Sequence, residues 1–113
     1  MTFLSPLRAA TYFVTTLAED GPGSLRQAMV DAMATPEADT ITFGVSGTIS
    51  PESTLPHPLA DGGPLTIDGG FRAVTIDGDG RRLIYVDTDA TLSLFNLTLK
   101  GGTLAAVYNR GTL

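Results

Sequence analysis

The chain has 113 residues, enough for one domain with a single modest core. Hydrophobic residues make up 42% and charged residues 17%, which excludes an intrinsically disordered chain. The absence of cysteine excludes disulfides, zinc–thiolate sites and thiol nucleophiles. With a net charge of −5 and no basic cluster, we expect no nucleic-acid partner. No apolar run is long enough for a membrane span, so we expect no membrane insertion.

The first ten residues are interpreted as a leader or tail. Met1–Ala10 lacks the apolar core of a secretory signal, so the chain shows no signal peptide. We predict a single domain over residues 1–113, in which this segment precedes the first structural element.

Residues 11–36 are predicted to form a strand followed by a helix. Tyr12–Leu17 is rich in β-branched and aromatic residues, which favour a strand. After a glycine-proline turn, Ser24 and Gln27 have the spacing of a capping box. An apolar stripe follows at helical spacing: Leu25, Ala28, Met29, Ala32 and Met33. The sequence therefore predicts an amphipathic helix over Ser24–Ala34.

Residues 37–64 are predicted to form an irregular first coil. Thr40–Phe43 alternates polar and apolar residues, and Gly47–Ile49 suggests a second short strand. Four prolines follow, and proline lacks the N–H that a strand ladder needs. We therefore expect edge or loop structure over most of this segment.

Residues 65–113 are predicted to form regular coils. Leu65–Gly69 is nearly repeated by Val74–Gly78, and each short run ends in a turn residue. Comparable runs begin at Leu65, Leu83 and Ala105, and a second series begins at Val74, Leu92 and Thr112. Two interleaved series of about 20 residues predict coils of three short strands that stack in parallel, a β-solenoid. An antiparallel sandwich is the alternative, but it gives no reason for the matched units.

The exposed end coils of such a stack present unpaired backbone and need a cover. The helix precedes the coils in the chain, so we predict that it covers the first one. The capping residues named on this basis are Ser24, Leu25, Gln27, Met29 and Met33.

Several segments resemble a known family. Phe13–Leu17, Asp20–Ala28 and Ala38–Phe43 resemble the N-terminal segment of large bacterial surface and secreted right-handed β-helix proteins. Those proteins carry PbH1-type repeats and often a C-terminal anchor or autotransporter-like region. Leu65–Gly69 and Tyr108–Leu113 resemble the coils that follow in that family.

The resemblance implies a mostly β protein, a right-handed parallel β-helix (solenoid) with an N-terminal capping α-helix. It also implies an extracellular or cell-surface scaffold, adhesin-like and without an assigned catalytic set. The chain would then be the cap and first coils of such a protein.

Five aspartates form the densest acidic group: Asp68, Asp77, Asp79, Asp87 and Asp89. Stacked corners of the coils could bring some of them together as oxygen ligands for Ca²⁺. Asp-Gly is also an ordinary turn dipeptide, and no calcium-repeat nonapeptide is present. We therefore name no catalytic, cofactor-binding or metal-binding residue, and Ca²⁺ is the one cofactor that the sequence leaves open.

The remaining polar residues are interpreted as structural. His57 has no second histidine or cysteine with which to complete a transition-metal site. Arg81 and Arg82 are expected to form ion pairs with nearby aspartates. Outward threonines such as Thr66, Thr75 and Thr98 suggest an ice-binding face, but we expect their columns to be interrupted.

The functional prediction concerns the last coil, which is expected to be uncapped. An open edge is a template for strand addition, and the edge residues predicted are Tyr108, Asn109, Gly111, Thr112 and Leu113. If Leu113 is the natural end, copies should stack into a head-to-tail filament or an end-to-end dimer. We therefore expect a non-enzymatic, self-associating structural module. The alternatives are a fragment of a β-helix polysaccharide lyase or hydrolase, and an adhesive domain that binds a surface glycan.

Overall fold

The computed structural model describes residues 10–34, 37–56, 63–80, 82–86, 88, 90–101 and 107–109, the last three by their backbone alone. Among these residues there are one helix, α1 (Leu25–Met33), and nine short strands. The strands are β1 (Thr11–Val14), β2 (Asp39–Phe43), β3 (Gly47–Ile49), β4 (Leu65–Asp68), β5 (Val74–Asp77), β6 (Ile84–Val86), β7 (Leu92–Phe95), β8 (Leu97–Lys100) and β9 (Val107–Asn109).

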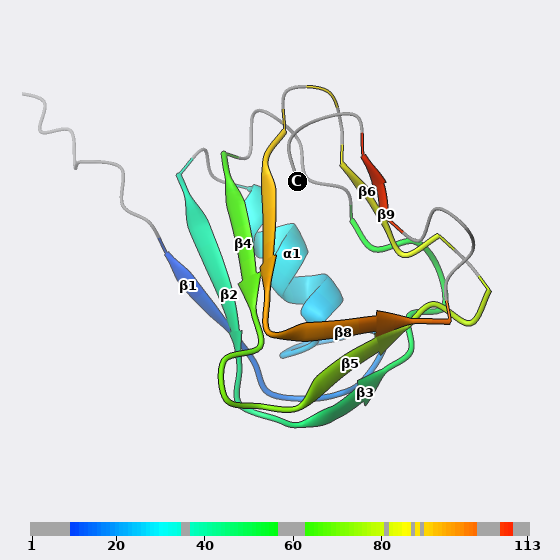
Figure 1. The fold of residues 1–113 in the computed structure, drawn as a ribbon. Helices are drawn as coiled ribbons and strands as arrows, with labels where there is room; N and C mark the ends of the chain where they lie inside the picture. Colours follow the sequence, from blue (N-terminus) through cyan, green and yellow to red (C-terminus); the bar gives the residue numbers. More distant parts are fainter. Residues whose placement is uncertain are drawn as a thin grey trace, which may run out of the picture.

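All pairings between the described strands are parallel, and these strands build three sheets. The first sheet has the order β1-β2-β4-β7, the second β3-β5-β8, and the third pairs β6 with β9. Strands that follow one another across a short corner, such as β4 and β5 or β7 and β8, lie in different sheets (Figure 1). Each sheet is therefore assembled from segments that are far apart in the chain.

The strands form where apolar and polar residues alternate, because side chains of a strand point to opposite faces. In β4 and β5, Leu65, Ile67, Val74 and Ile76 are buried, whereas the alternate residues are half-buried. These aliphatic side chains and the apolar face of α1 belong to one hydrophobic core. The described core is thus mainly aliphatic, with Phe43 as a buried aromatic residue, and threonines dominate the outward positions of the strands.

The corner between β4 and β5 shows why turn residues occupy these positions. A Cβ on Gly69 would collide with the backbone carbonyl of Asn96, so this close approach of two corners requires glycine. Asn96 itself adopts a left-handed φ of 56°, which asparagine tolerates better than most residues. Its Nδ2 donates to Asp68 Oδ1 at 2.9 Å, and Gly70 N donates to the same oxygen at 2.8 Å. The bond from Asn96 has the larger effect on the pKa of Asp68, and the two bonds together hold this pKa below its ordinary value.

The helix begins as the sequence predicts, with one difference. Ser24 is the N-cap, and its Oγ accepts from Gln27 N at 3.1 Å. The Gln27 side chain does not return to Ser24, because its Nε2 donates to Asp31 Oδ1 at 2.9 Å. Ser24 N donates instead to Gly21 O of the preceding turn. Only the serine half of the predicted capping box is therefore formed.

The predicted fold class, a right-handed parallel β-helix (solenoid) with an N-terminal capping α-helix, is corrected by this structure. The described residues form a small compact globule of short strands in parallel sheets with one helix. The Cα radius of gyration is 14.0 Å, close to the roughly 13 Å of a compact 100-residue domain.

The coil of about 20 residues on which that prediction depended is also wrong. Leu65 pairs with Leu92 rather than with Leu83, and Val74 pairs with Leu97 rather than with Leu92. The physical reason is that the connections between strands differ in length, so similarity between two short runs does not identify the strands that pair. Leu65–Asp68 and Val74–Asp77 resemble each other because both are half-buried strands that end in a turn.

Candidate functional site

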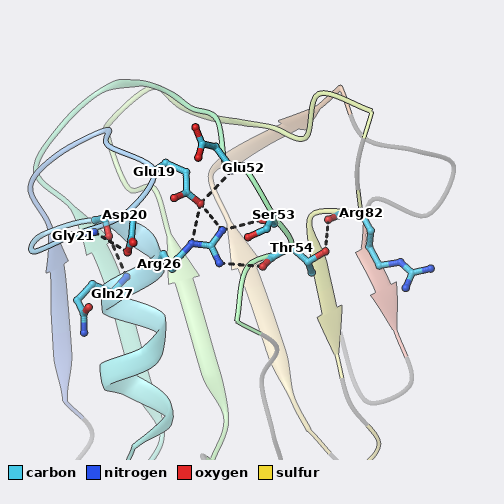
Figure 2. A network of polar contacts seen from close by, with 10 residues as sticks. Glu19, Asp20, Gly21, Arg26, Gln27, Glu52, Ser53, Thr54 and Arg82 are labelled. Carbon is cyan, nitrogen blue, oxygen red and sulfur yellow. Dashed lines mark hydrogen bonds and ion pairs between the residues drawn. The ribbon is translucent and has the colours of Figure 1, made fainter.

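The most extensive polar network of the described residues surrounds Arg26 on the first turn of α1 (Figure 2). Its Nε and Nη2 donate to Glu19 Oε1 at 2.9 and 2.6 Å. Its Nη1 and Nη2 also donate to the carbonyl oxygens of Thr54 and Ser53, at 3.0 and 2.8 Å. Glu52 N donates to the same Glu19 oxygen at 3.2 Å. Arg26 thus binds the loop before its own helix and the segment that follows β3.

The network continues toward the third sheet. Thr54 Oγ1 donates to Arg82 O at 3.0 Å, and Leu55 N donates to Leu83 O at 2.9 Å. The polar groups around Arg26 are therefore donors and acceptors that satisfy one another. We interpret this network as a set of hydrogen bonds that holds α1 in position against the rest of the molecule.

A small hollow lies between β1 and the start of α1. It is lined by Tyr12, Phe13, Gly23, Ser24, Gln27, Ala28 and Asp31, and its volume is about 80 Å³. Typical small-molecule sites measure about 300–1,000 Å³. The hollow is too small to hold a ligand of that kind.

The aspartates that the sequence offers as calcium ligands lie in separate turns. Asp68 Oδ1 accepts from Gly70 N, and Asp77 Oδ1 accepts from Asp79 N at 3.0 Å. Asp87 and Asp89 lie outside the described residues, as do His57 and Arg81. Within the part of the chain that the structure describes, no three acidic or histidine side chains gather as a metal site would require. The described aspartates act as turn residues.

The outward hydroxyl residues form longer columns than we predict from the sequence. Thr48, Thr75 and Thr98 occupy matching positions on β3, β5 and β8. A second column crosses the first sheet and consists of Thr11, Thr40, Thr66 and Ser93. The expectation of interrupted columns is wrong for these residues. The second column shows that Thr11 of β1 and Ser93 of β7 occupy equivalent positions along their strands.

The feature that distinguishes one end of the molecule is the pair of edge strands β7 and β8. Among the residues that the structure describes, each is the last strand of its sheet. Leu65 N donates to Thr91 O and Gly69 N to Phe95 O, so alternate backbone groups of β7 point toward β4. Because successive backbone groups of a strand alternate in direction, those of Leu92 and Leu94 point away from β4. The N–H and C=O groups of Leu92 and Leu94 are therefore placed to form hydrogen bonds with a further strand.

The inward side chains of these strands are incompletely covered. Leu94, Leu97 and Leu99 pack against the core but remain partly exposed. Their register partners one strand earlier are Ile67, Val74 and Ile76, with exposed fractions of 0%, 3% and 0%.

The sequence prediction placed the open edge later in the chain. Tyr108 and Asn109 lie in β9, the edge partner of β6, and only their backbone is described. Gly111, Thr112 and Leu113 lie outside the described residues. The leucines of β7 and β8 were missed because an inward leucine has the same alternating pattern whether or not a further strand covers it.

Comparison with family models, curated proteins and solved structures found no match to this chain. No helix within the described residues is long and apolar enough to cross a membrane. We define the candidate functional site by its geometry as the β7–β8 end, the residues Leu92–Lys100.

Proposed function

We propose that the chain is a non-enzymatic structural module that self-associates through the β7–β8 end. The observation that carries the proposal is the contrast between three leucines and their partners. Leu94, Leu97 and Leu99 are partly exposed at positions where the preceding strands bury their side chains fully or nearly so. Burial of aliphatic area stabilises association by about 25 cal/mol per Å² before the costs of binding are subtracted.

Backbone geometry supports the same proposal. An edge strand with outward-pointing N–H and C=O groups accepts another strand, which adds main-chain hydrogen bonds to the apolar contact. Charge supports it as well. The run Leu92–Lys100 contains no carboxylate, although the chain has 12 acidic residues and a net charge of −5. Two copies can therefore approach through this end without bringing opposed carboxylates together.

The test is the mass of the isolated 113-residue chain, measured by light scattering after size exclusion over a wide range of concentration. The proposal expects a species larger than the monomer that dissociates on dilution. A monomer at every concentration would contradict it. The extracellular or cell-surface location expected from the sequence stays a prediction.

Two substitutions identify the surface used. Leu97→Lys places a charge at a partly exposed inward position of an edge strand, and inward charges oppose strand addition. Phe95→Lys changes an outward residue of β7 that is 54% exposed, so it perturbs the monomer little. The matched control is Phe71→Lys in the fully exposed turn after β4. Association should weaken in the first two variants and persist in the control, with folding checked by circular dichroism.

A further inference from the structure

Exposed aromatic side chains gather on the outer side of the first sheet. Among the large hydrophobic residues that are exposed in the described ranges, Phe13 lies on β1, Phe95 lies on β7, and Phe71 lies in the turn that follows β4. The fourth such residue, Val30, lies on α1. Phe13 and Phe95 are 58% and 54% exposed, although an aromatic ring is normally buried in a core. Exposed apolar groups that gather in one place mark a contact surface.

The strand register places Phe13 and Phe95 in one row. Phe13 is the partner of Thr42, and Phe95 is the partner of Asp68. The residues that directly precede Thr42 and Asp68 pair with each other across β2 and β4. The two rings and the two polar side chains therefore form an outward row that crosses the whole first sheet (Figure 1). Neighbouring strands lie about 4.8 Å apart, so the backbones that carry the two rings are roughly 14 Å apart.

The ring of Phe13 is supported by the neighbouring strand. A Cβ added to Gly44, directly after β2, would lie 2.6 Å from Phe13 Cε2 and 3.0 Å from Phe13 Cζ. Because Gly44 has no side chain, the ring has room to lie against this backbone. Gly44 N donates to Val14 O at 2.8 Å, which holds the two strands together at this point. The ring is thus fixed on one side and open to solvent on the other.

The polar groups beside the rings are also held in place. Asp68 Oδ1 accepts from Asn96 Nδ2 at 2.9 Å and from Gly70 N at 2.8 Å. Both bonds use the same carboxylate oxygen, so Asp68 Oδ2 accepts no hydrogen bond from the described residues. The adjacent outward row consists of hydroxyl side chains: Thr11, Thr40, Thr66 and Ser93. The surface therefore offers a fixed carboxylate and a line of hydroxyls next to exposed rings.

This combination matches the chemistry of a sugar chain. The face of an aromatic ring carries partial negative charge, and it attracts the C–H groups on the flat side of a pyranose whose hydroxyls are equatorial. Those hydroxyls at the rim of the sugar donate to carboxylate and hydroxyl oxygens and accept from hydroxyl hydrogens. The same residues thus satisfy the apolar and the polar parts of one ligand.

Charge and hydration select among the possible ligands. The outward positions of these four strands carry one carboxylate and no lysine or arginine, so an anionic polymer would find no opposite charge. A lipid surface would cover the rings but would also bury the hydroxyls between them without partners, which costs free energy. In Figure 1, α1 and the other two sheets lie on the inner side of the first sheet, away from this row. A neutral, hydroxyl-rich ligand fits best.

We propose that the outer face of the first sheet binds a neutral glycan with equatorial hydroxyls, which lies across the strands from Phe13 to Phe95. The ligand must reach both rings across roughly 14 Å, so it is an oligosaccharide or polysaccharide and not a single sugar. This function is separate from association through the β7–β8 end, because it uses outward side chains of all four strands and not the backbone of an edge.

The test is calorimetric titration of the full 113-residue chain with two neutral hexasaccharides, cellohexaose and N-acetylchitohexaose. The proposal expects saturable binding of at least one of them and much weaker binding of the corresponding monosaccharide. The chain contains no tryptophan. Phe13→Trp therefore keeps an aromatic ring in place and supplies a single fluorescent reporter, whose emission should shift when the hexasaccharide binds.

Substitution of either ring should weaken binding. Phe13→Ala and Phe95→Ala each remove one stacked ring and should lower the affinity for the hexasaccharide about tenfold. The matched control is Val30→Ala, which removes an exposed apolar side chain from α1 and should bind as the unmodified chain does. All three residues are exposed, so the variants should fold, and circular dichroism checks this. Phe13→Ala should also leave the mass of the chain in solution unchanged.

The opposite results are equally clear. Absence of binding to both hexasaccharides, or equal affinities for the two phenylalanine variants and the unmodified chain, would overturn the proposal. Equal binding of an acidic hexagalacturonate would overturn the selection of a neutral ligand. Binding to phosphatidylcholine vesicles in place of either hexasaccharide would assign the rings to a membrane surface and overturn it too. A chain that associates but binds no glycan would overturn this proposal alone, and a monomer that binds glycan would overturn only the proposed association.

Discussion

Removal of the Arg26 side-chain charge should loosen α1 from the rest of the molecule. Arg26 donates four hydrogen bonds, two to Glu19 and two to the carbonyl oxygens of Ser53 and Thr54. The side chains of Arg26 and Glu19 are only 16% and 23% exposed. We choose Arg26→Met because methionine keeps most of the aliphatic packing that the arginine stem supplies.

The magnitude follows from the exposure of the partners. Hydrogen bonds to charged groups contribute about 1.5–3 kcal/mol each. The Ser53 and Thr54 acceptors are exposed and return to water when Arg26 is removed, so we count mainly the Glu19 interaction. The expected loss in free energy of unfolding is about 2–3 kcal/mol. At about 4–8 °C per kcal/mol for a small domain, Tm should fall by roughly 10–20 °C.

The assay is urea unfolding followed by circular dichroism, together with a thermal scan. Arg72→Met is the control, because Arg72 is exposed and the same charge is removed. A loss below about 0.5 kcal/mol for Arg26→Met, the level of an ordinary surface substitution, would refute the assigned role of the network. An equal loss in both variants would refute it as well, since the effect would then come from net charge.

Three further predictions concern single residues. Ser24→Ala removes the oxygen that caps Gln27 N and should cost about 1 kcal/mol of stability in urea unfolding; an unchanged midpoint would contradict the cap. Gly69→Ala forces a Cβ against the carbonyl of Asn96 and should lower the urea midpoint much more than Gly70→Ala. A Cβ at Gly70 meets open space and strains only the backbone. Equal losses in the two variants would contradict the close approach of Gly69 to Asn96. The pKa of Asp68 is depressed, so its hydrogen bonds stabilise the fold at pH values above about 3.8, the ordinary pKa of aspartate, and this contribution is lost as pH falls through the lower folded-state pKa. Asp68→Asn should therefore flatten the acid limb of the stability profile, and an unchanged acid limb would contradict the assignment.

The sequence predicts a helix or strand correctly where the residues of that element themselves carry the capping or alternation pattern. The Ser24 N-cap and the apolar stripe of α1 predict the helix because capping and helical spacing are properties of a few neighbouring residues. The strands at Leu65–Asp68 and Val74–Asp77 follow from alternation in the same way.

The sequence did not predict which strands pair with each other. Which strand lies beside Leu65 depends on the lengths of all the intervening corners, and those lengths are not periodic. The partner is Leu92, although Leu83 begins a comparable run. The same limit applies to the candidate site. The alternation in Leu92–Leu99 predicts an inward face, but only the assembled sheets reveal that β7 and β8 are edge strands whose leucines are incompletely covered.

The most direct test of the account is the mass of the 113-residue chain in solution, compared between the unmodified chain and Leu97→Lys. The account predicts a species larger than the monomer that dissociates on dilution, while Leu97→Lys remains folded and monomeric. A folded chain that is monomeric at every concentration would contradict the claim that the β7–β8 end is an association surface.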